Sequence, residues 1–198
     1  MPGGICIRVK VCGITRVDDA HYAEACGADA IGVVMFSDSQ RSVPPQQARE
    51  ILSSLAPSTM GVIVTHTTSE NELQEILSLR PDAVQISCPF SFPAHRDVKV
   101  FRMVKRGDPL MSDADAFVVD ESHGGGKRYD STFASDVVSR SKIPVVLAGG
   151  LTPENVREAI EQVHPDAVDV SSGVETMPGV KDKEKVRLFL EKCREAGL

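Results

Sequence analysis

A thiol and a carboxyl group stand at the ends of two segments that are far apart in the sequence. Cys12 ends the predicted strand Arg8–Cys12, and Asp120 directly follows the apolar run Ala116–Val119. A thiolate can act as a base or a nucleophile, and a carboxyl group in a dry site can act as an acid. Each residue also has a structural interpretation, Cys12 as a small buried apolar residue and Asp120 as a helix cap. The sequence therefore offers a candidate acid and a candidate base, with both interpretations open.

Two cationic side chains accompany this pair. Lys10 alternates with Cys12 along one strand, so both side chains are expected on the same face, where the ammonium would favour the thiolate. Arg41 lies in a polar loop that follows the predicted strand Ala30–Val34. Such a loop is usually only solvated, but a guanidinium can also bind a carboxylate through two parallel hydrogen bonds. Arg41 is therefore a candidate for binding an anionic ligand.

Small residues follow the last three predicted strands. Glycine-rich turns let backbone N–H groups approach an anion closely, and the loops after strands seven and eight of a barrel commonly bind phosphate. The glycine run before Lys127 is not a nucleotide-binding P-loop, because no Ser or Thr follows the lysine. The residues expected to contact a phosphorylated substrate are Gly125, Gly126, Gly149, Gly150, Asp169, Ser171, Ser172 and Gly173.

Metal and disulfide chemistry are not indicated. The five histidines show no H-x-x-x-H or H-x-E spacing, and the five cysteines are odd in number, widely spaced and without a C-x-x-C pair. We therefore expect free thiols and no metal site. His66 follows a predicted strand and could line the site, but the sequence assigns it no role.

Short apolar runs alternate with helical patterns along the whole chain. Continuous apolar runs are typical of strands that are buried on both faces, as in a parallel sheet. Apolar residues at i, i+3, i+4 and i+7 predict three amphipathic helices. The apolar patterns of these helices begin at Ala48, Val156 and Val186. The predicted strands are Arg8–Cys12, Ala30–Val34, Gly61–Val64, Ala83–Ile86, Val98–Val104, Ala116–Val119, Pro144–Ala148 and Ala167–Val170.

Eight strand–helix repeats predict an α/β fold, a compact (β/α)₈ TIM barrel in one domain over residues 1–198. An open doubly wound sheet is the alternative, although it usually has fewer strands. The unit around Val84–Arg96 has two prolines and no helical period, so its helix is expected to be short or missing. Helix starts are indicated by Ser69-x-x-Glu72, a capping box, and by Thr152-Pro153.

Composition limits the class of partner. Lysine and arginine number 22 against 28 aspartates and glutamates, a formal net charge of −6. A mildly acidic chain with no basic run is a poor candidate for binding nucleic acid or an anionic membrane. No apolar run approaches the roughly 20 residues of a membrane span, and the N-terminus has no apolar signal core. We therefore expect a cytoplasmic protein that acts on a small molecule.

The strand ends, taken together and in order, resemble the phosphoribosylanthranilate isomerases of tryptophan biosynthesis. The resemblance runs the whole chain, although AGG and SSG alone recur in other phosphate-binding barrels. The matching stretches are KVCGIT, GADAIGVVMF with SQRSV, VVD with GGGKRYD, LAGGLTPENV and AVDVSSGVETMPGVKD.

The resemblance implies a function and a role for several residues. Members of this family catalyse, without a cofactor, the Amadori rearrangement of N-(5-phosphoribosyl)anthranilate to the corresponding 1-deoxyribulose 5-phosphate. By position, Cys12 would be the general base, Asp120 the general acid, and Arg41 the residue that binds the anthranilate carboxylate. The phosphate would lie on the backbone of the GGG, AGG and SSG segments, and a homodimer is left open.

Two departures from the family pattern concern the substrate pocket. The family usually has VQLHG after its fourth strand, whereas this chain has Ser87 in the place of the histidine. The family's FDW after the glycine loop is replaced by Tyr129-Asp130-Ser131. Neither change affects the expected acid or base. Two rival functions stay open, another phosphosugar enzyme on a barrel, for which Lys10 would be the Schiff-base candidate, and a non-catalytic sensor of a phosphorylated ligand.

Overall fold

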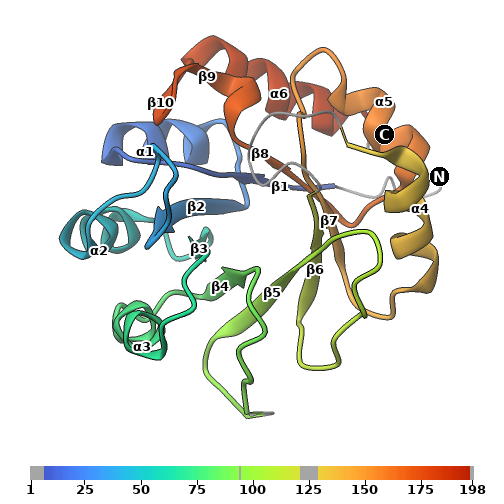
Figure 1. Ribbon diagram of the computed structural model, residues 1–198. Coiled ribbons are helices and arrows are strands. Elements are labelled where there is room, and N and C mark those ends of the chain that lie inside the picture. The colour runs from blue at the N-terminus through green and yellow to red at the C-terminus, as the bar shows by residue number, and fades with distance from the viewer. Residues whose placement is uncertain (1–6, 94, 121–128, 197–198) are drawn as a thin grey trace.

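The computed structural model describes residues 7–93, 95–120 and 129–196, and in it eight parallel strands close into a barrel in chain order (Figure 1). The predicted TIM barrel is therefore confirmed, and every predicted strand is present within two residues of its expected bounds. The strands are β1 (Arg8–Val11), β2 (Ala30–Met35), β3 (Met60–Thr65), β4 (Ala83–Ile86), β5 (Lys99–Val104), β6 (Ala116–Val119), β7 (Val145–Leu147) and β8 (Ala167–Val170).

The strands are buried on both faces because each face packs against a different layer. Residues such as Val11 and Ile31 point outward into the main core between the barrel and the helices. Residues such as Val34, Val62 and Val64 point inward and pack in smaller clusters inside the barrel. This double burial explains why the strand sequences are continuous apolar runs with no polar alternation.

Within the described residues, six α-helices cover the outside of the barrel. The three helices predicted from their apolar period are α2, α5 and α6, and each buries the apolar stripe that identified it. None of the helices in the described residues is long and apolar enough to cross a membrane. The helices are α1 (Val17–Ala25), α2 (Pro45–Ser54), α3 (Glu70–Ser78), α4 (Ser131–Arg140), α5 (Val156–Val163) and α6 (Lys183–Ala196).

One of the two predicted helix starts is correct. The hydroxyl of Ser69 accepts a hydrogen bond from the N–H of Glu72, as a capping residue should. The prediction for Thr152 is wrong, because α5 begins only at Val156 with Asn155 at its N-cap. Thr152 and Asn155 are the ends of a turn. The Asn155 side chain closes this turn by accepting a hydrogen bond from the N–H of Thr152 at 2.8 Å.

The quarter of the barrel around β4 and β5 has no covering helix in the part of the chain that is described. A short or missing helix after β4 was expected, but the expectation of eight complete repeats is wrong after β5 as well. Arg102 of β5 is buried there and holds the loops together, donating to the carbonyl of Cys88 at 2.8 Å and to the carboxylate of Asp113 at 2.6 Å. One buried arginine thus replaces part of the helical layer.

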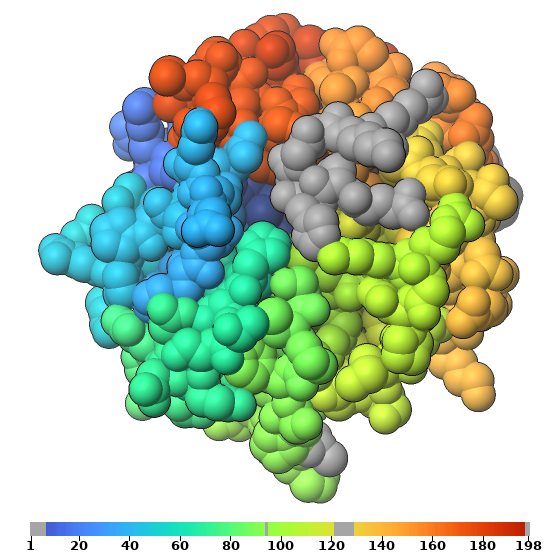
Figure 2. All heavy atoms as spheres, in the orientation of Figure 1, coloured from blue at the N-terminus to red at the C-terminus, as the bar shows by residue number. Residues whose placement is uncertain are grey.

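A short hairpin interrupts the chain between β8 and α6. It follows the 3₁₀ turn η1 (Ser172–Val174) and consists of β9 (Glu175–Met177) and β10 (Val180–Lys181). The hydroxyl of Thr15, in the loop after β1, donates to the carbonyl of Gly179 at 2.5 Å and ties the hairpin to the barrel. The hairpin (orange-red) and the β2 loop (light blue) lie next to each other at the upper left of the face seen in Figure 2.

Candidate functional site

A cavity of about 530 Å³ opens at the carboxyl ends of the strands. This is the end of a (β/α)₈ barrel where functional residues are carried, because the loops that follow the strands meet there. The predicted residues that line the cavity are Cys12, Arg41, Asp120, Gly149, Gly150, Asp169, Ser171 and Ser172. Of the described residues predicted to bind substrate, Gly173 alone is absent from the lining, and Gly125 and Gly126 lie outside the described residues.

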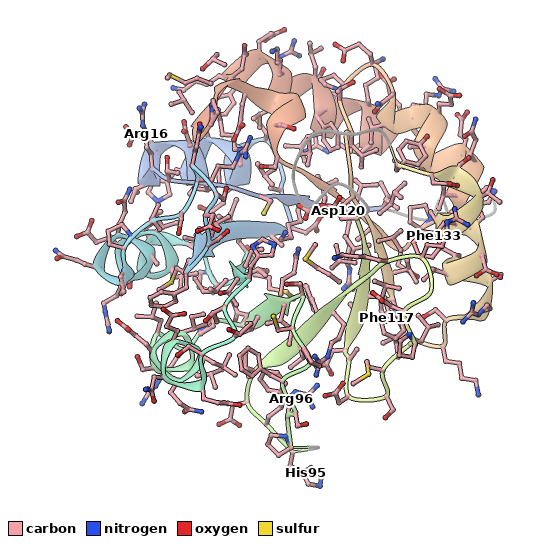
Figure 3. All side chains as sticks on the ribbon, viewed as in Figure 1. Arg16, His95, Arg96, Phe117, Asp120 and Phe133 are labelled. Atoms are coloured by element: carbon pink, nitrogen blue, oxygen red, sulfur yellow. The ribbon has the colours of Figure 1, made fainter. Side chains whose placement is uncertain are left out.

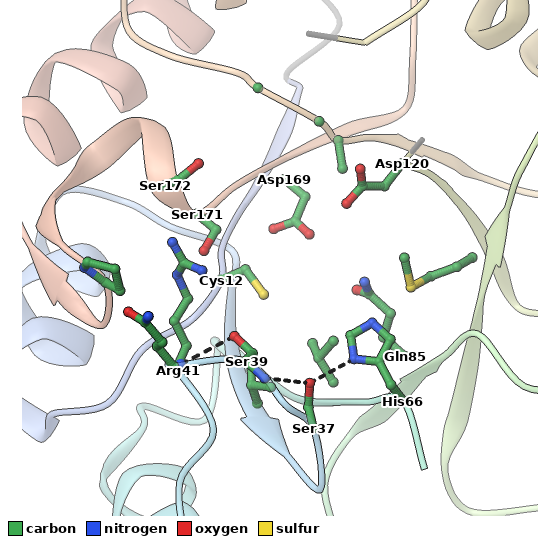
Figure 4. Close-up of a pocket in the computed structure, with 18 of the residues that line it drawn as sticks. Cys12, Ser37, Ser39, Arg41, His66, Gln85, Asp120, Asp169, Ser171 and Ser172 are labelled. Carbon is green, nitrogen blue, oxygen red and sulfur yellow. Dashed lines mark hydrogen bonds between the residues drawn. The ribbon is translucent and has the colours of Figure 1, made fainter. Parts of the chain in front are cut away.

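The candidate acid and base share this cavity. Cys12 comes directly after β1 and Asp120 directly after β6, and each is only 8% exposed. Figure 3 shows Asp120 near the middle of the ring of strands, whereas Arg16 and His95 lie at the periphery. In the close-up of Figure 4, the Cys12 sulfur points into the space that the Asp120 carboxylate also faces. The two groups are therefore placed to act on one ligand from different sides.

An ion pair is buried next to the thiol. The Lys10 ammonium lies 2.6 Å from Oδ2 of Asp169 and donates to Oε1 of Gln85 at 3.0 Å. The strand ladder creates this contact, because Lys10 and Asp169 are direct partners in the pairing of β1 with β8. Burial is the largest single influence and lowers the pKa of Lys10, but the charges and hydrogen bonds of Asp169 and Cys12 together outweigh it, so the pKa is raised. The lysine is therefore held as an ammonium ion.

Asp169 has one oxygen committed to Lys10 and one that is not. Its Oδ1 is buried and has no hydrogen-bond partner among the described residues, although the side chain lines the cavity. Burial raises the pKa of Asp169 against the opposing charge of Lys10. A buried acceptor without a partner is costly, so a ligand hydroxyl or amine at this point would be stabilised.

The absence of a side chain at Gly32 of β2 lets Lys10 and Cys12 lie together. A Cβ atom at Gly32 would come within 2.8 Å of the Cys12 sulfur and 3.0 Å of Cε of Lys10. The predicted proximity of the ammonium to the thiol is therefore confirmed. The expected net depression of the thiol pKa is wrong, because burial raises the pKa of Cys12 by more than Lys10 lowers it. The free protein thus holds Cys12 as a thiol near neutral pH.

The guanidinium fork of Arg41 already holds a carboxylate, that of Glu175 in β9. Nε of Arg41 donates to Oε1 at 2.9 Å, and Nη2 donates to Oε2 at 2.6 Å. Glu175 therefore occupies the Nε/Nη2 edge of the guanidinium, and a two-bond contact with a substrate carboxylate through the Nη1/Nη2 end stays a prediction. Among the described residues Nη1 makes no hydrogen bond, so it is the nitrogen that is fully available to a ligand.

The loops after β7 and β8 pack closely enough to require glycine. Gly149 and Gly150 have φ of +95° and +59°, in the left-handed region that favours glycine. A Cβ atom on Gly173 would lie 1.9 Å from the carbonyl oxygen of Leu151, so the β8 loop is packed directly on the β7 loop. Gly173 thus has a packing reason to be glycine, and its contact with substrate stays a prediction.

Several residues that line the cavity were not assigned to the site from the sequence. Ser37 accepts a hydrogen bond from the N–H of Ser39 at 3.2 Å and contacts Nδ1 of His66 at 3.0 Å, which orders the β2 loop at the cavity wall (Figure 4). His66 lines the cavity as considered from its position after β3. Gln85 was detectable, because a lone amide inside an apolar strand points to a polar partner in the interior.

The two departures from the family pattern concern different parts of the structure, the loop after β4 and the start of α4. Ser87 follows β4 and is not among the described lining residues, so no side chain replaces the family's histidine from that position. His66 on the neighbouring strand is the imidazole that lines the cavity instead. Asp130, in the altered YDS segment, caps α4 by accepting a hydrogen bond from the N–H of Phe133 at 3.0 Å.

These features define a (β/α)₈-barrel protein with a polar cavity at the carboxyl ends of its strands. The model of the family described as N-(5'phosphoribosyl)anthranilate (PRA) isomerase matches residues 9–192. The chain therefore belongs to the N-(5'-phosphoribosyl)anthranilate isomerase family, as the resemblance indicated.

Individual relatives agree over nearly the whole chain. A protein of Methanoregula boonei named N-(5'-phosphoribosyl)anthranilate isomerase is 56% identical over 191 residues, which are 96% of this chain and 98% of that protein. A crystal structure of a phosphoribosyl anthranilate isomerase in complex with reduced 1-(o-carboxyphenylamino)-1-deoxyribulose 5-phosphate is 32% identical, with a TM-score of 0.76 over 96% of this chain and 99% of that chain. A structure described as monomers of the dimeric isomerase from Thermotoga maritima is 31% identical, with a TM-score of 0.77 and the same coverage.

Proposed function

We propose that this chain converts N-(5'-phosphoribosyl)anthranilate to 1-(2-carboxyphenylamino)-1-deoxyribulose 5-phosphate, with Cys12 as general base and Asp120 as general acid. The observation that supports the assignment of roles is that a thiol after β1 and a carboxyl group after β6, with β7 and β8 between these strands in the barrel, line one cavity. An aldose-to-ketose rearrangement needs both groups, because one proton is given to the sugar and another is taken from it.

The reaction begins with opening of the furanose ring. Asp120, in its protonated form, gives its proton to the ring oxygen while the anilino nitrogen donates its electron pair to C1′. The C1′–O bond breaks and an iminium ion forms. Asp120 is left as a carboxylate beside that cation.

The second proton transfer uses the thiol. The Cys12 thiolate removes the proton from C2′, and the electron pair of that C–H bond neutralises the iminium as the enolamine forms. Since burial disfavours the thiolate in the free protein, its ionisation depends on nearby positive charge, supplied by Lys10 and by the iminium itself. The enolamine then tautomerises to the ketone.

Binding energy comes from both ends of the substrate. In this proposal the phosphate binds the backbone of Gly149, Gly150, Ser171 and Ser172. The contacts predicted for Gly173, and for Gly125 and Gly126, which lie outside the described residues, are part of the same proposal. Left-handed glycine turns support this assignment because they turn successive N–H groups toward one point. Arg41 faces the anthranilate carboxylate, and the unpartnered oxygen of Asp169 accepts a hydrogen bond from the sugar or the amine.

The test is direct conversion of the proposed substrate. The purified protein is mixed with N-(5'-phosphoribosyl)anthranilate, and loss of the fluorescence of the anthranilate adduct is followed for the wild type and for Cys12→Ala. We expect rapid loss with the wild type and little with the variant. Absence of conversion by the wild type would overturn the proposal.

The rival Schiff-base mechanism at Lys10 is disfavoured by its surroundings. An amine must be neutral to attack a carbonyl, whereas Asp169 holds the pKa of Lys10 above its ordinary value. Borohydride trapping of a Lys10 adduct would restore that rival. A ligand sensor is distinguished by binding without turnover.

The proposed setting of the enzyme follows from the same family. We propose that residues 1–198 act as one domain, in the cytoplasm, without metal or cofactor and without nucleic-acid or membrane partners. The proposed protein partner is a second copy of this chain, supported by the dimeric description of the Thermotoga maritima relative. The mass of the species in solution, measured by light scattering, tests this homodimer.

A further inference from the structure

The carboxylate of Glu175 is buried between two cations in the wall of the cavity. Its side chain is 4% exposed and accepts hydrogen bonds from Arg41 and, at 2.9 Å, from the Lys181 ammonium. The N–H of Gly179 donates to the same Oε1 at 3.2 Å. Both carboxylate oxygens are therefore engaged by protein groups, and Glu175 does not line the cavity among the described residues.

We propose that Glu175 is a positioning residue that fixes the guanidinium of Arg41, so that the enzyme presents Nη1 in one orientation to the carboxylate of the anthranilate ring. The proposal rests on the role assigned above to Arg41. It makes Glu175, on the β9–β10 hairpin, a determinant of substrate specificity although it does not touch the substrate.

The whole length of Arg41 is restrained, not only its charged end. Its backbone N–H donates to the hydroxyl of Ser39 at 3.2 Å. Its alkyl stem crosses Gly13, where a Cβ atom would come within 2.6 Å of Cδ. Glu175 then engages two of the three guanidinium nitrogens. An arginine held in this way loses little rotamer freedom on binding, which strengthens its contact with an anion.

Lys181 links this arrangement to the proposed phosphate loop. The Lys181 ammonium donates to the carbonyl of Ser171 at 3.2 Å as well as to Glu175. The Lys181 side chain is 2% exposed, so it too is removed from direct contact with solvent. One carboxylate therefore connects the residue that would bind the ring carboxylate with the loop that would bind the phosphate.

A competing explanation is that Glu175 only neutralises buried positive charge. Arg41, Lys181 and Glu175 together carry a net charge of +1, and removal of the glutamate charge would raise it to +2. Greater positive charge attracts an anionic substrate more strongly. Charge neutralisation therefore predicts tighter binding after Glu175→Gln, whereas positioning predicts weaker binding, so the two explanations differ in sign.

The experiment measures binding of two ligands that differ only in the ring carboxylate. They are reduced 1-(o-carboxyphenylamino)-1-deoxyribulose 5-phosphate and the same compound without the carboxyl group, titrated calorimetrically into wild type and Glu175→Gln. We expect the Kd of the carboxylated ligand to rise about 10-fold in Glu175→Gln, as for loss of a charge-assisted hydrogen bond. The Kd of the second ligand should change less than about twofold.

Two further variants keep the test decisive. Glu175→Asp retains the charge but draws the carboxylate back by one methylene, and we expect it to weaken binding of the carboxylated ligand in the same selective way. If thermal unfolding shows that Glu175→Gln does not fold, Glu175→Asp tests the positioning role in its place. Glu184→Gln, in an exposed ion pair with Arg187 on α6, is the matched control and should change neither Kd.

The outcomes separate this inference from the proposed function. If the wild type binds neither ligand, the proposed function itself fails. If the wild type prefers the carboxylated ligand and the folded Glu175 variants keep the full preference, or bind that ligand more tightly, the positioning role of Glu175 is wrong. An equal loss for both ligands would also overturn it, because that result indicates a general disturbance of the cavity.

Discussion

The ion pair beside the Cys12 thiol and the ion pair of Arg41 are positioned by different means. Lys10 and Asp169 meet because hydrogen-bonded pairing of β1 with β8 makes them direct partners in a closed barrel. Arg41 and Glu175 lie on a loop and a hairpin, 134 residues apart in sequence, and are joined by side-chain hydrogen bonds. The first arrangement follows from backbone register, and the second depends on the side chains themselves.

This difference separates chemistry from recognition. Groups on strand ends inherit the rigidity of the barrel, which suits proton transfers that tolerate little displacement. Groups on loops can be changed without disturbing the barrel, which suits a choice between substrates. Substitutions in the first region should therefore lower kcat, and those in the second should raise KM.

The largest effect is expected at Cys12 and Asp120, the two groups proposed to transfer protons. Cys12→Ala or Asp120→Asn should each lower kcat by at least about 100-fold with KM nearly unchanged, because both groups act in the transition state. Steady-state kinetics with N-(5'-phosphoribosyl)anthranilate measures this. Turnover near the wild-type level in either variant would remove that residue from the mechanism.

The next effect concerns the charge beside the thiol. Burial places the pKa of Cys12 above its ordinary value and Lys10 lowers it, so the wild-type rate should rise toward alkaline pH as the thiolate forms. Lys10→Met removes the opposing charge, and we expect kcat to fall about 10-fold at neutral pH with the alkaline rise displaced upward.

The control for that variant is Lys10→Arg, which keeps the positive charge. Its pH–rate profile should lie closer to that of the wild type than the profile of Lys10→Met. Superimposable profiles for Lys10→Met and the wild type would show that the ammonium does not influence Cys12, and would break the link between strand register and chemistry.

Arg41→Ala should have a smaller effect, and this effect should be mainly on KM and not on kcat. We expect KM to rise about 10-fold with kcat reduced less than threefold or so, because the arginine binds the ground state and the transition state alike. Glu175 would retain Lys181 as its ionic partner, so the hairpin should stay folded. An unchanged KM would contradict recognition of the ring carboxylate by this loop.

The smallest effect on catalysis is expected from the quarter of the barrel without helices. Arg102→Met removes a buried cation that lies outside the cavity, and kinetic constants should stay within about twofold of the wild type. The free energy of unfolding should fall by about 2 kcal/mol, since the Cys88 carbonyl and Asp113 lose a charged donor.

Urea titration measures the stability of Arg102→Met. Arg140→Ala, which breaks an exposed ion pair with Asp136 on α4, is its control and should change stability by less than about 1 kcal/mol. A large loss of activity in a folded Arg102→Met protein would show that this quarter contributes to the site after all.

The parts of the site that could be predicted share a dependence on short-range pattern. The alternation of Lys10 and Cys12 predicted their common face, and the position of Asp120 after an apolar run predicted its place at a strand end. Small residues after the last strands predicted a phosphate site in those loops, which stays a prediction. Glu175 could not be found in this way, because a glutamate in a loop is ordinary until its two cationic partners are known.

Two predictions failed because a second interaction outweighed the signal on which each was based. Thr152-Pro153 is a sound helix start in isolation, but Asn155 closes a turn over those residues and delays α5. The expected net lowering of the Cys12 pKa considered a nearby lysine without the dehydration that accompanies burial, which acts in the opposite direction and is larger.

The sequence by itself determined the barrel, its strands and the family, because hydrophobic period and strand-end motifs are local properties that survive without coordinates. Only the tertiary structure decided which charges meet. It paired Lys10 with Asp169 beneath the thiol and engaged Arg41 with Glu175, since barrel closure and loop packing bring together residues that no spacing along the chain relates. The electrostatic attraction within each of these ion pairs then depends on how completely the surrounding contacts exclude water.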